Sequence, residues 1–145
     1  MIYLGSDHGG YKLKEVLEEH LRATGVEVED LGVHSETPSD YPDNAKLVAE
    51  KVAANPGSLG VLLCRNGQGI CIAANKIKGI RAAAAWLPEI AASARKDDDA
   101  NVLCIASDYT DEQTAKVMVD AFLQTKFENI ARRVRRLEKL NKLEQ

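Results

Sequence analysis

The chain has 145 residues, of which 45% are hydrophobic and 28% charged, with a formal net charge of −3 at pH 7. That length and composition are typical of one globular domain, here residues 1–145, with a hydrophobic core of its own. The small negative charge gives no general attraction to nucleic acid or anionic membranes, and no apolar run approaches the roughly 18 residues of a membrane span.

Five short apolar segments predict β-strands. In the second, valines and a leucine alternate with acidic residues, which is typical of an edge strand. The third, Val61 to Cys64, is wholly apolar, as expected of a buried strand in a parallel sheet. The expected strands are residues 2–5, 26–31, 61–64, 80–85 and 101–106.

Helices are expected between and after these strands, because apolar residues recur there every three or four positions. Gly25 ends the first helix, and Pro88 suits the first turn of the fourth. Thr110 and Gln113 form a predicted capping box at the start of the fifth. The expected helices include residues 11–22, 88–94, 110–123 and 127–143. A further helix begins at a cap at Asp43 or Asn44 and stops at residues 55–57, and another begins at residue 70.

This alternation predicts a doubly wound α/β fold, with a five-stranded parallel sheet between two helical layers and strand order 2-1-3-4-5. In that order the first and third strands flank the topological switch point of the sheet, where the connections that leave the two strands run in opposite directions. Ligands bind at the carboxyl ends of such strands. The segments at those ends are Asp7-His8 and residues 64–69. The fold therefore predicts that two distant motifs meet, with His8 as a ligand residue.

The second of these motifs joins a cysteine to a glycine-rich turn. Cys64 ends the buried strand, and Arg65-Asn66-Gly67-Gln68-Gly69 leads into the next helix. Backbone N–H groups in such a turn can face an anion, and their partial positive charge would favour a thiolate at Cys64. The alternative is a buried structural cysteine followed by an ordinary turn.

The terminal helix carries a narrow apolar stripe that predicts packing against another surface, such as a second subunit. Arg132 and Arg136 lie one turn apart beside it, where they would clamp a phosphate or form a solvated basic face. The stripe comprises Phe127, Ile130, Val134, Leu137 and Leu140.

The remaining cysteines indicate a reducing compartment. Cys71 and Cys104 have apolar neighbours and are predicted to be packed core thiols, and with Cys64 they form no C-x-x-C pair. Met1 leads directly into a strand without a signal peptide, so we expect a cytoplasmic protein. No metal site is expected, since no histidine or spaced carboxylate set accompanies the acidic residues 97–99.

Five motifs together carry a resemblance to a known family. They are Asp7-His8-Gly9-Gly10, Asp40-Tyr41-Pro42, Cys64 with Gly67-x-Gly69-Ile70 through Lys76, Asp99-Ala100-Asn101-Val102-Leu103, and Arg132 with Arg135-Arg136. With these motifs in order over nearly its whole length, the chain resembles the ribose-5-phosphate isomerase B family, which also contains galactose-6-phosphate isomerase subunits.

The resemblance implies an aldose–ketose isomerase with a Rossmann-like fold, no metal and no cofactor, active as a homodimer or a dimer of dimers. Its sites would lie between subunits, with the terminal helix at the interface. Cys64 would move the proton between C1 and C2 of a sugar phosphate. The implied contacts are the backbone of Arg65, Asn66, Gly67, Gln68 and Gly69 for the enediolate oxygens, Asp7 for the sugar oxygens, His8, Arg132 and Arg136 for the phosphate, and Tyr41 lining the pocket.

The chain departs from the family pattern at three places. Asp97 and Asp98 replace a His-Asn pair whose histidine is assigned to ring opening, Asp108 replaces an arginine, and Arg65-Asn66 replaces Gly-Thr. Asp97 would then take the ring-opening role and Asp98 a substrate contact, although an aspartate at neutral pH is a base rather than an acid.

Three alternatives to a pentose-phosphate isomerase follow. The first is the same chemistry on a hexose 6-phosphate of galactose or allose type. The second is a sugar-phosphate-binding protein without turnover, suggested by the three acidic replacements. The third is a flavodoxin-like nucleotide-binding module, which the missing third glycine at Rossmann spacing disfavours.

Overall fold

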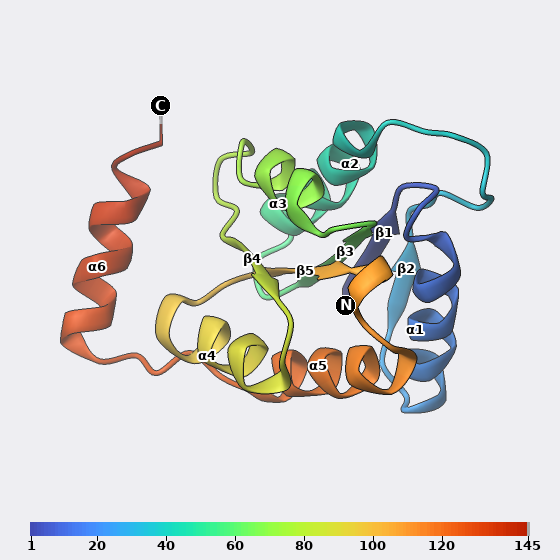
Figure 1. Ribbon diagram of the computed structural model, residues 1–145. Helices are drawn as coiled ribbons and strands as arrows, with labels where there is room; N and C mark the ends of the chain where they lie inside the picture. The colour runs from blue at the N-terminus through green and yellow to red at the C-terminus, as the bar shows by residue number, and fades with distance from the viewer. Residues whose placement is uncertain (145) are drawn as a thin grey trace.

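The computed structural model describes residues 1–144; Gln145, the last residue of the expected domain, lies outside them. A single five-stranded parallel sheet lies between two layers of helices, as expected (Figure 1). The strands are β1 (Ile2–Ser6), β2 (Val28–Asp30), β3 (Leu59–Cys64), β4 (Ala82–Ala85) and β5 (Val102–Ala106). None of the helices within residues 1–144 is long and apolar enough to cross a membrane.

Each face of the sheet has its own hydrophobic core. Helices α2 and α3 cover one face, and α1, α4 and α5 cover the other (Figure 1). The helices are α1 (Tyr11–Ala23), α2 (Tyr41–Ala54), α3 (Gln68–Ala74), α4 (Pro88–Asp98), α5 (Glu112–Gln124) and α6 (Ala131–Asn141), with a short 3-10 helix, η1, at Ser107–Tyr109.

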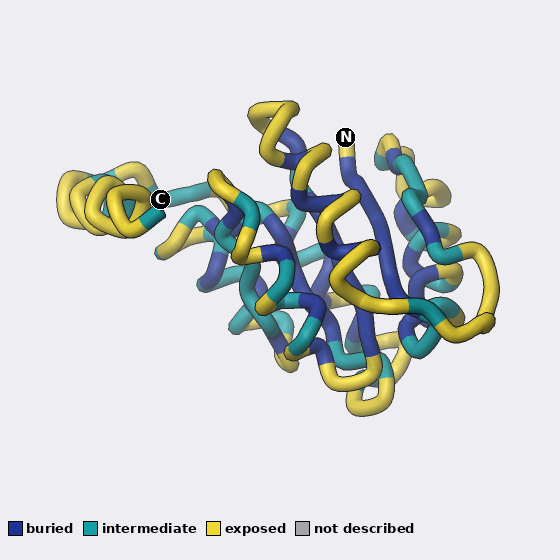
Figure 2. Tube along the Cα trace, turned by 90° about the horizontal axis from the view of Figure 1, so that it is seen from above, coloured by how far each residue is buried: buried dark blue, intermediate teal, exposed yellow. Residues whose placement is uncertain are grey.

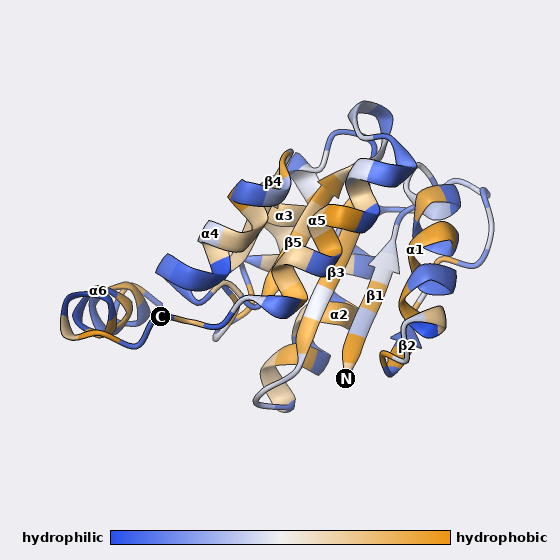
Figure 3. Ribbon diagram, turned by 90° about the horizontal axis from the view of Figure 1, so that it is seen from below, coloured by the Kyte–Doolittle hydropathy of each residue, from blue (hydrophilic) through white to orange (hydrophobic). Residues whose placement is uncertain are grey.

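The predicted strand order 2-1-3-4-5 is wrong in its last two positions. The sheet runs β2-β1-β3-β5-β4, so β5 lies inside and β4 at the edge. Residues 102–105 are fully buried, whereas Ala82, Ala83 and Ala84 of β4 are half-buried. Bulky Val-Leu-Cys-Ile removes more apolar area from water in the centre than an alanine run does, and Figure 3 shows the apolar character of β3 and β5. The β1–β3 pair stays adjacent, so the predicted ligand edge is unaffected.

Several helix ends also differ from prediction. Asp40, and not Asp43 or Asn44, is the residue before α2, because Pro42 fits its first turn. The capping box at Thr110 is wrong: the Asp111 carboxylate caps α5 by accepting a hydrogen bond from Thr114 N at 2.8 Å. Helix α4 continues past Ala94 to Asp98, since no glycine or proline stops it there.

Helix α6 begins at Ala131, four residues later than predicted, and stands apart from the sheet (Figures 1 and 2). None of its residues is buried within the chain. Phe127, Ile130, Val134 and Leu137 of the apolar stripe are half-buried, and Leu140 is 45% exposed. The stripe is therefore only partly covered in a single chain.

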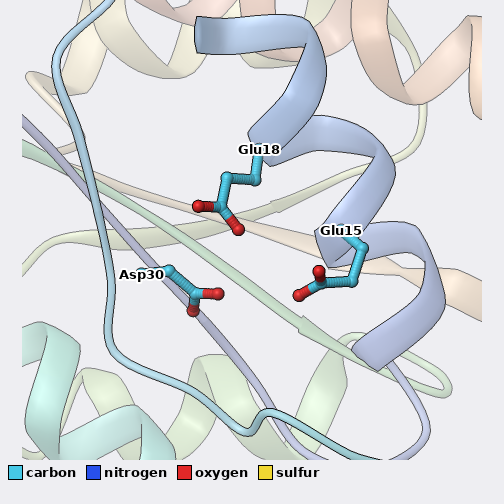
Figure 4. A group of neighbouring side chains, drawn as sticks. All are labelled: Glu15, Glu18 and Asp30. Carbon is cyan, nitrogen blue, oxygen red and sulfur yellow. The ribbon is translucent and has the colours of Figure 1, made fainter.

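A buried lysine joins α1 to the end of β2. Lys14 is 0% exposed, and its Nζ lies 2.5 Å from Asp30 Oδ2 and 2.7 Å from Glu15 Oε1. The carboxylates of Glu15, Glu18 and Asp30 point toward one another (Figure 4), with oxygens within 4.8 Å. The Lys14 ammonium supplies the positive charge that such a cluster requires.

Candidate active site

The two motifs at the carboxyl edge of the sheet meet as predicted. β1 and β3 are hydrogen-bonded neighbours, and Ser6 pairs with Leu63 one residue before Asp7 and Cys64. Asp7 N also donates a hydrogen bond to Leu63 O at 3.2 Å. Strand pairing thus fixes the Asp7-His8 turn beside the thiol.

The Asp7 side chain is buried and hydrogen-bonded within this turn. It is 7% exposed, and its Oδ1 accepts a hydrogen bond from Gly10 N at 3.0 Å. Gly10 has no room for a side chain, because a Cβ there would lie 2.6 Å from Leu63 O. The turn can therefore approach β3 closely only with glycine at position 10.

The imidazole of His8 is oriented by Ser39. Ser39 N donates a hydrogen bond to His8 Nδ1 at 3.1 Å, and His8 N donates one to Ser39 Oγ at the same distance. A neutral ring whose Nδ1 accepts carries its proton on Nε2, so Nε2 is a donor suited to an anion. The sequence analysis missed Ser39; its place just before the Asp40-Tyr41-Pro42 motif was the available signal.

The Cys64 thiol lies under the turn that follows it. Cys64 is 5% exposed, and its Sγ is 3.8 Å from Asn66 Oδ1. The same Asn66 oxygen accepts a hydrogen bond from Gln68 N at 3.0 Å, so that amide is already satisfied in the chain. Behind the thiol, Ser107 Oγ donates a hydrogen bond to Cys64 O at 2.8 Å.

Both glycines of the turn are required by close contacts. Gly67 has φ 71°, and a Cβ there would lie 2.9 Å from Ala106 N of β5. At Gly69 a Cβ would lie 2.7 Å from the Cζ atom of Tyr41. The Tyr41 ring therefore packs directly against Gly69.

The other two thiols influence each other beneath α3. A hydrogen bond from Cys104 lowers the pKa of the Cys71 thiol, against the opposing effect of burial. The same hydrogen bond, together with complete burial, raises the pKa of Cys104 well above its usual value. Cys104 is fully buried, as predicted, whereas Cys71 is only partly buried.

Four predicted site residues do not join this group within one chain. Asp97 and Asp98 lie in the last turn of α4, which runs from the carboxyl end of β4 back to the amino end of β5, the edge opposite Cys64. Asp98 lines a cleft between β4 and α6. Arg132 and Arg136 are exposed on α6, which stands apart from the sheet.

The Asp97 carboxylate forms an ion pair with Arg133. Its Oδ1 lies 2.8 Å from Arg133 Nη2. The Arg133 guanidinium, 13% exposed, also pairs with Glu128 and donates a hydrogen bond to Lys96 O at 3.1 Å. These contacts fasten the start of α6 to the end of α4.

A family model described as ribose/galactose isomerase matches residues 2–140 of the chain. A probable ribose-5-phosphate isomerase B of Mycoplasma genitalium is 44% identical over 99% of this chain and 95% of its own length. The ribose-5-phosphate isomerase B of Escherichia coli K12 is 41% identical over 99% and 96%.

Solved structures agree with these relatives. Ribose-5-phosphate isomerase B of Clostridium thermocellum superposes with a TM-score of 0.95 at 38% identity, covering 98% of this chain and 95% of that one. The Mycoplasma genitalium enzyme, solved with bound ribulose 5-phosphate, gives a TM-score of 0.93 at 42% identity over 98% and 94%.

Proposed function

The chain belongs to the ribose/galactose isomerase family, and we propose that it is an aldose–ketose isomerase that interconverts ribose 5-phosphate and ribulose 5-phosphate. The observation that carries the proposal is the meeting of Asp7, His8 and Cys64 at the carboxyl edge of β1 and β3. Relatives that are 40–48% identical, matched over 84–95% of their own length, bear the name ribose-5-phosphate isomerase B or probable ribose-5-phosphate isomerase B.

Cys64 is the proposed base. A thiolate at Sγ would take the proton from C2 of the open-chain aldose and return it to C1, while the hydroxyl proton on O2 passes to O1. The negative charge that develops on the enediolate oxygens would be met by free backbone N–H groups of the turn before α3. Gln68 N is excluded from this role while Asn66 Oδ1 accepts its hydrogen bond.

The phosphate would be bound by His8 Nε2–H together with Arg132 and Arg136. Because both arginines lie on α6, away from Cys64 in the same chain, the proposal requires a second subunit to supply them. The apolar stripe at and before α6, which the chain covers only in part, supports a two-fold dimer, in which each copy completes the site of the other. A dimer of dimers would satisfy the same requirement.

Asp97 and Asp98 would also reach the substrate from the partner. An ionised Asp97 paired with Arg133 can accept a proton from a sugar hydroxyl but is a poor donor to a ring oxygen. The three free thiols fit a cytoplasmic location.

A hexose 6-phosphate isomerase is the second candidate. Its support is the family description, which includes galactose isomerases, together with the acidic residues Asp97, Asp98 and Asp108. Turnover of a panel of pentose 5-phosphates and hexose 6-phosphates distinguishes the candidates. We expect ribose 5-phosphate to have the highest kcat/KM, and Cys64→Ala provides the inactive control. Binding of these sugars without turnover would instead support a sugar-phosphate-binding protein.

A further inference from the structure

A cleft of about 730 Å³ opens next to His8, on the outer side of the Asp7-His8 turn. Its walls come from the start of α1, the turn after β3 and the segment between β5 and α5. Three basic side chains, His8, Lys12 and Arg65, lie along it, together with the carboxylates of Glu36, Asp108, Asp111 and Glu112. Glu36 pairs with Lys12 and Asp111 caps α5, so His8 and Arg65 are the basic groups that remain for the anionic end of a ligand.

Arg65 is placed in this cleft by the missing side chain of Gly9. A Cβ on Gly9 would lie 2.4 Å from Arg65 Cγ and 3.1 Å from its Nε. The arginine side chain therefore runs directly across the backbone of the residue after His8. This contact directs the Arg65 guanidinium toward the cleft although the residue is largely exposed.

The guanidinium keeps its hydrogen-bonding capacity. Its ion-pair partner within residues 1–144 is Asp108, whose Oδ1 lies 3.7 Å from Nη1, too far for a hydrogen bond. Asp108 N donates a hydrogen bond to Arg65 O at 2.9 Å, which keeps the two residues together. Lys12, by contrast, pairs with Glu36 at 3.3 Å and is less available.

We propose that the Arg65 guanidinium, with His8, binds the phosphate of the substrate from within the same chain, and that Asp108 weakens this binding by competing for the guanidinium. This inference rests on the proposed function. It makes Arg65 a substrate-binding residue through its side chain, in addition to its backbone position beside Cys64. It also makes Asp108 a residue that tunes affinity, with an effect opposite in sign to that of Arg65.

The test uses inorganic phosphate as the probe, at fixed ionic strength. The full-length chain and its Arg65→Gln, Arg65→Lys and Asp108→Asn variants are titrated with phosphate by calorimetry, and KM and kcat are measured on ribose 5-phosphate. Arg22→Gln is the matched control, because Arg22 is an exposed arginine paired with Glu18 on α1 and lies outside the cleft. Melting temperatures verify folding, which an exposed pair such as Arg65–Asp108 should hardly change.

We expect Arg65→Gln to weaken phosphate binding and raise KM at least tenfold, as the loss of a charge-assisted hydrogen bond should, while kcat changes less. Arg65→Lys should recover part of the loss, and Asp108→Asn should bind phosphate more tightly than the wild type. Phosphate affinity and KM that match the Arg22→Gln control in the Arg65→Gln variant would overturn the inference, as would a fall in kcat with KM unchanged.

Failure of the isomerase proposal would give a different experimental outcome from failure of the Arg65 proposal. If the wild type turns over no sugar phosphate but loses phosphate binding on Arg65→Gln, the isomerase proposal fails and the anion site stands. If the wild type is active and Arg65→Gln binds phosphate normally, only the role of Arg65 is overturned.

Discussion

At the candidate site, the hydrogen bonding and packing of each side chain depend on the backbone next to it. His8 presents a donor at Nε2 because Ser39 N occupies Nδ1, and Tyr41 reaches the turn because position 69 has no side chain. The three thiols likewise differ through their surroundings, since Cys64 ends β3 under a polar turn while Cys71 and Cys104 share a hydrogen bond beneath α3. Reactivity should follow these contacts rather than exposure alone.

The Cys71–Cys104 pair gives a pH-dependent prediction. Because the pKa of Cys71 is lowered and that of Cys104 is raised, iodoacetamide should label Cys71 at a pH where an ordinary thiol is still protonated, and Cys104 should stay unlabelled in the folded protein. Peptide mass spectrometry across pH 6–9 measures both rates. In Cys104→Ala, labelling of Cys71 should shift to higher pH; an unchanged profile would contradict the role assigned to the hydrogen bond.

Single elements are held in place by a few buried polar contacts. Burial alone would raise the pKa of Asp30, but hydrogen bonds from Lys14 and Gly32 N–H outweigh it and lower that pKa. The contribution of Asp30 to stability is therefore present above its unfolded pKa, near 3.9, and is lost as pH falls through the lower folded value. The Lys14–Asp30 contact fixes α1 against β2, at the base of the loop that carries Ser39.

Lys14→Met should destabilise the protein by about 3 kcal/mol at pH 7, because it leaves Asp30 partly buried beside Glu15 and Glu18 without its ammonium partner. Urea unfolding followed by circular dichroism measures the loss, which should shrink below pH 4 as the carboxylates become protonated. Lys12→Met on the same helix is the control, since Lys12 is 83% exposed. Equal effects of the two substitutions would refute the importance of burial at Lys14.

The sequence was sufficient for the element types and for the meeting of Asp7 and Cys64, because both depend on local periodicity and on adjacent β1 and β3. The order of β4 and β5 was not predicted correctly. The sequence did hold the relevant difference, because the side chains of Val-Leu-Cys-Ile in β5 are larger than those of the alanine run in β4, and these four residues of β5 are fully buried in the structure. The cap of α5 depended on the choice between Thr110 and the adjacent Asp111, which sequence patterns do not resolve.

Side-chain contacts between residues far apart in the chain could not be predicted from the sequence. The place of Ser39 before the Asp40-Tyr41-Pro42 motif marked the segment but not its hydrogen bonds with His8, and the ion pair of Asp97 with Arg133 links segments that the sequence analysis treated separately. Arg65 was predicted to act through its backbone, and only the contact with Gly9 reveals the direction of its side chain.

At the scale of the whole molecule, the proposal assigns Arg136 of one subunit to the site that holds Cys64 of the other. If sites lie between subunits, mixing Cys64→Ala with Arg136→Ala and allowing exchange should restore activity, because half of the dimers would be mixed and one of their two sites would be intact. About a quarter of wild-type activity is expected for random exchange in a two-fold dimer. Arg135→Ala, at an adjacent exposed position, replaces Arg136→Ala in the control mixture. No recovery beyond the sum of the separate variants, or a fully active monomer by light scattering, would contradict a shared site.

The most direct measurement of the proposed chemistry is kcat of Cys64→Ala on ribose 5-phosphate. Loss of a general base should lower kcat by roughly 10²–10⁴-fold and leave KM nearly unchanged, because the phosphate contacts remain. Cys71→Ser is the matched control and should keep near-normal kcat, since Cys71 lies within α3, with its thiol near Ala82 O of β4 rather than at the turn. A Cys64→Ala variant with near-normal kcat would contradict the cysteine mechanism.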